Sequence, residues 1–128
     1  MITSDLNNPI KQVGGDHYER LKIQPSVLFR RLNCLTWAQC NMIKYASRYA
    51  SKGYPIQDIE KVISYAEFAI NTDWRSTYRS RHRALVNEFI YTNGFDDFQK
   101  SIMRAVLDNR YHTVIEDCKQ KIVELKSE

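Results

Sequence analysis

Residues 36–52, TWAQCNMIKYASRYASK, decide the fold. Thr36 followed three residues later by Gln39 is the sequence form of a capping box, so this stretch predicts a helix that begins at Trp37. Gly53 is placed to end the helix, because glycine adopts the left-handed conformation beyond a C-terminus without strain. The apolar side chains that share one face of this helix are Ala38, Met42, Ala46 and Tyr49.

A second stripe of the same helix is polar and mostly cationic. Its members, spaced three or four residues apart, are Asn41, Lys44, Arg48 and Lys52. Most basic stripes on helices are solvated faces, and that is the simplest interpretation. However, this helix contains no acidic residue that could form the i,i+4 pairs that usually neutralise such a face. The cations therefore need a partner from another part of the chain or from a ligand.

A second helix is predicted from about Ile56 to Asn71. The i, i+3, i+4 pattern of its buried face comprises Ile59, Val62, Ile63, Ala66 and Ile70. The connection through residues 53–55 is short, so the two helices should be antiparallel neighbours in an αα-hairpin at about 36–71.

A polar face of the second helix lies beside its buried face and carries Asp58, Lys61 and Tyr65. Near the turn of the hairpin, Lys52 is placed to face Asp58. Lys44 and Tyr65 lie further along the hairpin. Spacing leaves open whether these side chains line a pocket or form a structural salt-bridge network.

The rest of the chain also predicts helices and no strand. A helix ending near Asn33 precedes the hairpin, and a helical pattern runs from Thr72 to Thr92. Two further helices are expected after the breaks at Asn93-Gly94 and Asp108-Asn109, and they span about 96–107 and 111–125. The fold class is therefore all-α: a single domain of residues 1–128, in which helices of residues 72–128 extend a small bundle built on the hairpin.

Composition narrows the class of protein. The length of 128 residues fits one domain, and the net charge of +4 permits an anionic ligand without requiring nucleic acid. The cysteines, at positions 34, 40 and 118, lack CxxC spacing, which indicates reduced thiols in a cytosol. The histidines, at 17, 82 and 112, share no ligand spacing with them, so no metal site is expected. No stretch has the pattern of a membrane span or a signal peptide, and we expect a cytoplasmic protein with no membrane partner.

A glycine pair lies in residues 12–18, QVGGDHY. Gly14 and Gly15 allow a sharp turn that exposes backbone N–H groups, the arrangement of an anion-binding nest, although a plain turn has the same signature. The following residues supply an acceptor, a group that titrates near neutrality and a ring that can stack on a base; they are Asp16, His17 and Tyr18.

Several enzyme classes lack their motifs in this sequence. There is no P-loop, no G-x-G-x-x-G and no G-x-S-x-G, and Glu60 and Glu67 lack the E-x-x-E spacing of all-α metal pyrophosphatases. The remaining candidate is an anion site that consists of Gly14, Gly15, His17, Lys44, Arg48 and Lys52. Phosphoryl transfer depends mainly on positioning and charge stabilisation, so such a site could support catalysis, or it could bind a nucleotide without turnover. The catalytic candidates are His17, Lys44 and Arg48.

Linked motifs along the first half of the chain resemble a small phage-encoded family, known as SaV-like or as phage nucleotide kinases. The motifs are residues 12–18, LKIQP at 21–25, NMIKY at 41–45, and then Arg48, Lys52, Asp58, Lys61 and Tyr65. The resemblance covers about residues 12–71 and departs from the family pattern at Ala50, where a second arginine is common.

That resemblance implies a phage protein of the host cytoplasm that binds nucleotides. It also implies phosphoryl transfer to a deoxynucleoside monophosphate, for which Mg²⁺ and a nucleoside triphosphate would be the cofactors. The expected nucleotide- or phosphate-binding residues are then Gly14, Gly15, Asp16, His17, Tyr18, Asn41, Lys44, Tyr45, Arg48, Lys52, Asp58, Lys61 and Tyr65.

Two other functions remain open. The arginine-rich stretch 75–83 and the helices after it are compatible with a phage interaction protein that inhibits a host enzyme or defence system. The same stretch could contact nucleic acid, which we consider the weaker alternative. The C-terminal helices are expected either to complete the core or to form a subunit interface, and we expect a homo-oligomer.

Overall fold

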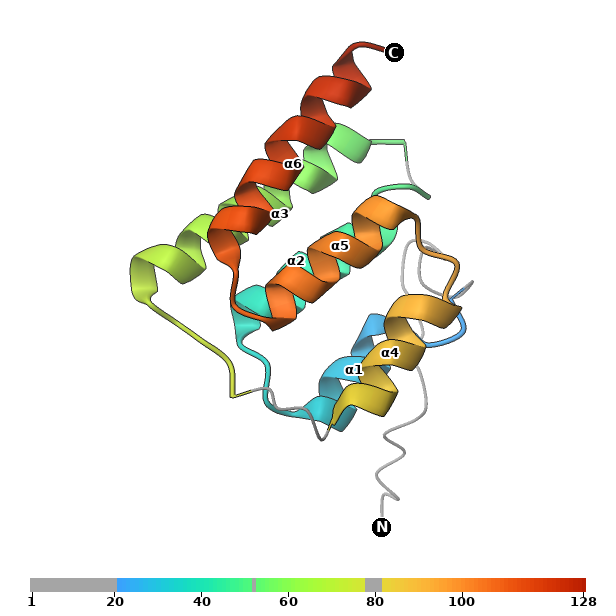
Figure 1. Cartoon of the computed structure of the whole chain (residues 1–128), viewed down its shortest axis with the longest axis vertical. Helices are drawn as coiled ribbons and strands as arrows, with labels where there is room; N and C mark the ends of the chain where they lie inside the picture. Colours follow the sequence, from blue (N-terminus) through green and yellow to red (C-terminus); the bar gives the residue numbers. More distant parts are fainter. Residues whose placement is uncertain (1–20, 52, 78–81) are drawn as a thin grey trace.

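The computed structural model describes residues 21–51, 53–77 and 82–128, and within these ranges it contains six helices and no strand (Figure 1). This confirms the prediction of an all-α fold. In chain order the helices are α1 (Pro25–Leu32), α2 (Trp37–Arg48), α3 (Pro55–Thr72), α4 (Arg83–Thr92), α5 (Asp97–Leu107) and α6 (Tyr111–Lys126).

Two capping boxes determine where α2 and α5 begin. The Gln39 backbone N–H donates to Thr36 Oγ1 at 3.1 Å, and the Thr36 N–H donates to Gln39 Oε1 at 3.0 Å. Asp96 and Gln99 make the same reciprocal pair at the start of α5, with both distances 2.8 Å. Each box satisfies backbone donors that would otherwise be unpaired, so the predicted helix starts are confirmed.

The end of α2 differs from the prediction. The helix was expected to run to Gly53, but it ends at Arg48, and Tyr49 follows as its C-cap. The Ser51 N–H and hydroxyl both donate to the Arg48 carbonyl, at 3.0 and 3.1 Å. This local pairing replaces the next helical hydrogen bond, as short polar side chains commonly do outside helix interiors.

The helix predicted from Thr72 to Thr92 is also wrong in its first part, because α4 begins only at Arg83. Asp73 adopts a left-handed conformation with φ of 50°. Its N–H donates to the Ile70 carbonyl at 3.2 Å, and the Trp74 N–H donates to the Ala69 carbonyl at 3.1 Å. These two bonds form a Schellman motif, which ends α3.

The α2–α3 hairpin is the centre of the fold. In Figure 1, α5 lies against α2 and α6 lies against α3, while α1 and α4 pair beside them. The predicted core positions of α2 are all buried: Ala38, Met42, Ala46 and Tyr49. In α3 the prediction holds for Ile59, Val62 and Ala66, whereas Ile63 and Ile70 are only half-buried.

This packing gives the hairpin two faces. One face is covered by α5 and α6, and the opposite face points away from them. None of the helices in the described ranges has the length and apolar character needed to cross a membrane.

Candidate functional site

The outer face of the hairpin, the side turned away from α5 and α6, carries most of the polar residues predicted to bind phosphate. Because α2 and α3 are antiparallel, the end of α2 lies next to the start of α3. The residues of this outer face are Trp37, Asn41, Lys44, Tyr45 and Arg48 of α2 and Asp58, Lys61, Tyr65 and Phe68 of α3.

A stacked pair of tyrosines lies in the middle of the outer face. The rings of Tyr45 and Tyr65 are almost parallel, at 11°, and their centroids are 6.0 Å apart. Each ring comes from a different helix, so the contact fixes the two helices relative to each other. An offset stack of this kind stabilises by about 0.5–1.5 kcal/mol beyond the buried area.

Three cations surround the Tyr45 ring. Lys61 Nζ and Arg48 Cζ each lie 4.8 Å from its centroid, and Lys44 Nζ lies at 5.4 Å. All three distances are within the range of cation–π attraction, because the face of an aromatic ring is electron-rich. We call this group, consisting of Lys44, Tyr45, Arg48, Lys61 and Tyr65, the tyrosine–cation cluster.

The orientation of Arg48 is set by a buried carboxylate. Asp58 is 1% exposed and accepts hydrogen bonds from Arg48 Nε at 3.2 Å to both of its oxygens and from Nη2 at 3.0 Å. A forked pair of this kind holds the guanidinium plane in one direction. The partner predicted for Asp58 was Lys52, which lies outside the described residues. Within the described residues, the partner of Asp58 is Arg48, so part of the cationic stripe is neutralised inside the protein.

The tyrosine–cation cluster and Asp58 together retain positive charge. Three cations and one carboxylate sum to +2. Cations outnumber carboxylates in this group of residues, and an anion is attracted to such a group. This arrangement can therefore bind an anion such as a phosphate, and Lys44 and Lys61 supply N–H donors for it.

Asn41 lies on the outer face but makes a contact within its own helix. Its Nδ2 donates to the Trp37 carbonyl at 2.9 Å. The remaining predicted residues, Gly14 to Tyr18 and Lys52, lie outside the described residues. The structure thus brings together Asn41, Lys44, Tyr45, Arg48, Asp58, Lys61 and Tyr65.

Sequence reasoning missed a row of aromatic rings that continues from Tyr65. The Trp37 ring lies 5.2 Å from Tyr65 and 5.6 Å from Phe68, and Phe68 lies 6.3 Å from Trp74. Trp37 is the first residue of α2, and it is 54% exposed. The i, i+4 spacing of Trp37, Asn41 and Tyr45 places all three on the polar stripe, and this signal could have identified it.

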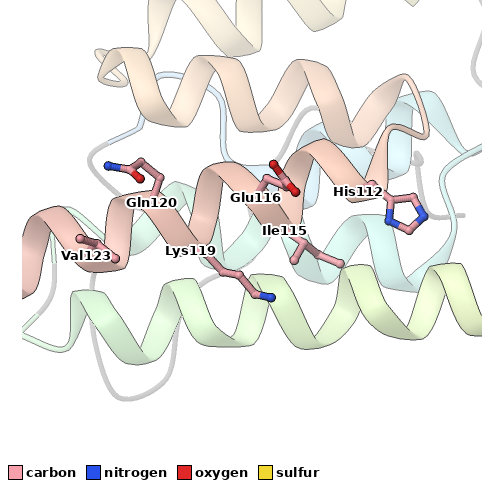
Figure 2. Close-up of a pocket in the computed structure, with 6 residues that line it drawn as sticks. All are labelled: His112, Ile115, Glu116, Lys119, Gln120 and Val123. Atoms are coloured by element: carbon pink, nitrogen blue, oxygen red, sulfur yellow. The ribbon is translucent and has the colours of Figure 1, made fainter.

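Another hollow, of about 430 Å³, lies along α6 (Figure 2). It is lined by His112, Ile115, Glu116, Lys119, Gln120 and Val123. Its charged side chains are of both signs, and it contains no residue predicted to bind phosphate. Within the described ranges, no group of three or more His, Cys, Asp or Glu side chains has the arrangement of a metal site.

The described structure does not favour cysteine chemistry. Burial raises the pKa of the Cys118 thiol to about 12, with a smaller contribution from Asp117. Burial and the neighbouring Cys34 raise the pKa of Cys40 to about 11. The thiolate is the nucleophilic form, so both groups are poor nucleophiles near neutral pH.

Comparison with known families connects the outer face to one sequence unit. Residues 7–67 match the model of the DUF3310 family. This family is described as a protein of unknown function, so the match names no activity. The matched region includes α1, α2 and most of α3, and with them the whole tyrosine–cation cluster, whereas α4, α5 and α6 lie outside it. Neither the curated proteins nor the solved structures gave a match.

Proposed function

We propose that the outer face of the hairpin binds nucleotides and that the tyrosine–cation cluster holds a phosphate. The observation that carries this proposal is the placement of three cations within 5.4 Å of the centroid of one stacked tyrosine ring. Lys44 and Arg48 come from α2 and Lys61 from α3, so the packing of the hairpin brings the third cation to the same ring.

The phosphate contacts follow from the two lysines. Lys44 is exposed and Lys61 is half-buried, so both ammonium groups lie where a ligand can reach them. Hydrogen bonds to a charged group contribute about 1.5–3 kcal/mol each. Arg48 has its guanidinium fixed by Asp58, and it adds positive potential without the entropy loss of ordering a long side chain.

The base would stack on the aromatic rings next to the tyrosine–cation cluster. Trp37 is the nearest exposed ring, since it contacts Tyr65 directly. Indole rings bind bases through their faces, and every base offers a face for stacking. A phosphate site with an aromatic surface beside it favours a nucleotide over inorganic phosphate.

Phosphoryl transfer is the further part of this proposal. The resemblance to phage nucleotide kinases suggests a deoxynucleoside monophosphate as acceptor, with a nucleoside triphosphate and Mg²⁺ as the other reactants. Catalysis would then use His17 with Lys44 and Arg48, in a phage protein that works in the host cytoplasm. Binding without transfer would instead make the protein a nucleotide carrier.

Isothermal titration against mono-, di- and cyclic nucleotides tests the binding. We expect heat of binding with the wild type and about a tenfold or greater loss of affinity in Lys44→Ala and in Lys61→Ala. Lys119→Ala on α6 is the matched control, because it also removes one exposed lysine from a helix. Arg48→Ala is a poor test, because it leaves Asp58 buried without its cation. No binding across the panel would remove the proposal.

A phosphoryl-transfer assay separates the kinase from the carrier. The protein is incubated with a deoxynucleoside monophosphate, ATP and Mg²⁺, and the diphosphate product is measured by chromatography. Product that depends on Lys44 supports a kinase. Binding without product supports a carrier.

A second candidate function is a phage interaction protein that inhibits a host enzyme or defence system. It is favoured by the hollow along α6, where Val123 is 61% exposed and Ile115 is half-buried. The test is capture of a stoichiometric host protein by the tagged chain, with loss of capture in Val123→Asp. Capture that is unchanged by this substitution would reject α6 as the binding surface.

A further inference from the structure

The aromatic row on the outer face is longer than one nucleotide requires. Beyond the Tyr45–Tyr65 stack it continues through Trp37, Phe68 and Trp74, and each ring lies within 6.3 Å of the next. The last three rings are 54%, 39% and 43% exposed. A single base can cover one such ring, so the other two have no role in the binding of a mononucleotide.

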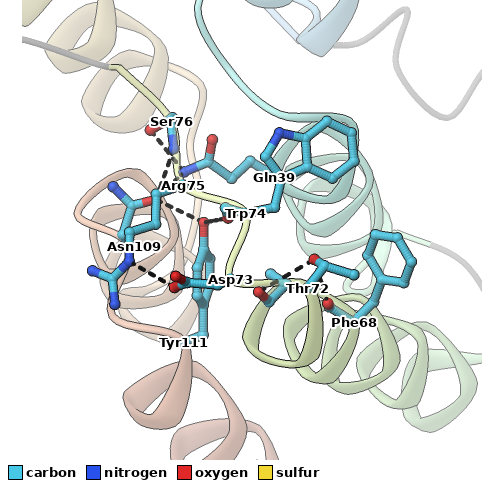
Figure 3. Close-up of polar contacts among 10 residues, drawn as sticks. Gln39, Phe68, Thr72, Asp73, Trp74, Arg75, Ser76, Asn109 and Tyr111 are labelled. Atoms are coloured by element: carbon cyan, nitrogen blue, oxygen red, sulfur yellow. Dashed lines mark hydrogen bonds and ion pairs between the residues drawn. The ribbon is translucent and has the colours of Figure 1, made fainter.

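The far end of the row is held in place by its backbone, although the Trp74 ring is exposed. The Trp74 N–H donates to the Ala69 carbonyl at 3.1 Å, and the Trp74 carbonyl accepts from the Tyr111 hydroxyl at 3.3 Å. Figure 3 shows the segment 73–76 held against Asn109 and Tyr111. The indole is therefore presented by an ordered backbone, which lowers the entropy cost of binding.

Asn109 is the centre of this anchor. Its Oδ1 accepts from the Ser76 N–H at 3.1 Å, from Gln39 Nε2 at 3.2 Å and from the Tyr111 hydroxyl at 2.7 Å (Figure 3). The side chain of Gln39 belongs to the capping box of α2, so the same network connects the start of α2 to the Trp74 segment. Trp37 and Trp74 thus lie on elements that are tied to one another.

The dimensions of the row fit several bases. Trp37 and Tyr45 are separated by eight residues of one helix, a distance of about 12 Å along its axis. Proteins that bind single strands combine a cationic groove with aromatic side chains on which successive bases stack. Here the cations lie at the Tyr45 end of the row. Next to Trp74 in the chain is Arg75, whose side chain is 68% exposed and pairs with the exposed Asp73 at 3.3 Å.

We infer that the outer face binds a short single-stranded oligonucleotide, with bases against Trp37, Phe68 and Trp74 and a backbone phosphate in the tyrosine–cation cluster. This inference rests on the proposed nucleotide binding and adds the length of the ligand to it. Recognition is through stacking and charge, so the site is tolerant of base sequence.

Tryptophan fluorescence tests the length dependence, because Trp37 and Trp74 are the two tryptophans of the chain. The ligands are dTMP and thymidine oligonucleotides of two, four and eight residues at one ionic strength. We expect quenching by all of them, with affinity that rises about fivefold or more for each added nucleotide up to about three and then levels off. Added salt should weaken binding of the tetranucleotide more than binding of dTMP.

Trp74→Ala separates the row from the phosphate site. This variant should bind the tetranucleotide about fivefold or more weakly and should bind dTMP as the wild type does, with Trp37 as the remaining reporter. Equal affinities for dTMP and the tetranucleotide, or an unchanged tetranucleotide affinity in Trp74→Ala, would overturn the inference and leave nucleotide binding intact. No quenching and no heat with any ligand, dTMP included, would overturn both.

Discussion

The outer face of the hairpin and the hollow along α6 differ in what holds their charged side chains. On the outer face, Arg48 is 16% exposed and is fixed by a buried carboxylate, and its neighbours surround a stacked ring. Along α6, Glu116 and Lys119 are exposed and lie on one helix. The α6 hollow has the volume of a small-molecule site, but its polar groups are of opposite sign and solvated. The two regions thus differ in how firmly their charged side chains are held, and this difference is the reason that we propose the outer face, and not the α6 hollow, as the nucleotide site.

Asp58→Asn gives the largest expected difference between the two regions. It removes the charge that neutralises Arg48 in a buried position, and breaking such a pair costs about 3–5 kcal/mol. The free energy of unfolding, measured by urea denaturation, should fall by that amount. Glu116→Gln, the matched change on α6, should alter it by less than about 0.5 kcal/mol. Equal effects of the two substitutions would show that Arg48 and Asp58 form an ordinary surface pair.

The Tyr111 anchor predicts a pH dependence at the Trp74 end of the outer face. Burial raises the pKa of the Tyr111 hydroxyl from 10.0 to about 12, and the nearby Arg75 opposes this shift. The unfolded chain therefore loses this proton at a lower pH than the folded protein, and ionisation stabilises the unfolded state. Stability from this group is complete below pH 10 and is lost as the pH rises towards 12, by about 1.4 kcal/mol per pH unit.

Urea unfolding of the wild type and Tyr111→Phe at pH 9, 10, 11 and 12 measures this contribution. The difference in unfolding free energy between the two proteins should be constant up to pH 10 and should then shrink. Tyr49 also has a raised pKa, because it is buried and donates to Asp96, and it stays in both proteins as an internal reference. A constant difference up to pH 12 would mean that the Tyr111 hydroxyl is not held in a buried hydrogen bond.

Variants that each lack one lysine compare nucleotide binding by the outer face and by α6. Lys44→Ala and Lys61→Ala should each reduce the free energy of nucleotide binding by about 1.5–3 kcal/mol, because each removes a charged donor to phosphate. Calorimetric titration at low and high salt measures the loss, which should shrink at high salt. Lys119→Ala should bind as the wild type. A similar loss in all three variants would indicate attraction by net charge alone.

The smallest expected change in stability comes from removing an ion pair on α6. Lys121 Nζ lies 3.7 Å from Glu124 Oε2, and Glu124 is more than half exposed. An i,i+3 pair of this kind contributes about 0.5 kcal/mol or less. Glu124→Gln should lower the thermal unfolding midpoint by no more than a degree or two, by circular dichroism. A loss of stability as large as that of Asp58→Asn would mean that the charged side chains of α6 are held as firmly as those of the outer face, and the two regions would then not differ.

Much of the fold could be predicted from local sequence, because its helix starts depend on short-range chemistry. The reciprocal bonds of Thr36 with Gln39 need only residues three apart, and the break at Asn93-Gly94 uses a glycine whose φ is +76°. The end of α2 and the non-helical segment after α3 were missed, because they depend on local bonds made by Ser51 and on the left-handed conformation of Asp73. The spacing of apolar residues in the sequence does not show which of these local hydrogen bonds forms.

The residues that lie in the candidate site could be predicted from the sequence, but which of them pair with one another could not. Helical spacing placed Lys44 and Arg48 on one stripe, and Lys61 and Tyr65 on another. The pairing of Arg48 with Asp58 depends on the register of α2 against α3, which follows from packing. The aromatic row was not predicted, because spacing along α2 does not show that the Trp37 ring contacts Tyr65 and Phe68 of α3.

The most direct test of the account is a ¹H–¹⁵N spectrum of the labelled protein during titration with a deoxynucleoside monophosphate. We expect the largest shifts at the amides of Lys44, Tyr45 and Lys61, and no shift at Lys119 and Gln120 on α6. Shifts centred on α6, or a spectrum unchanged at millimolar nucleotide, would contradict the claim that the tyrosine–cation cluster binds phosphate.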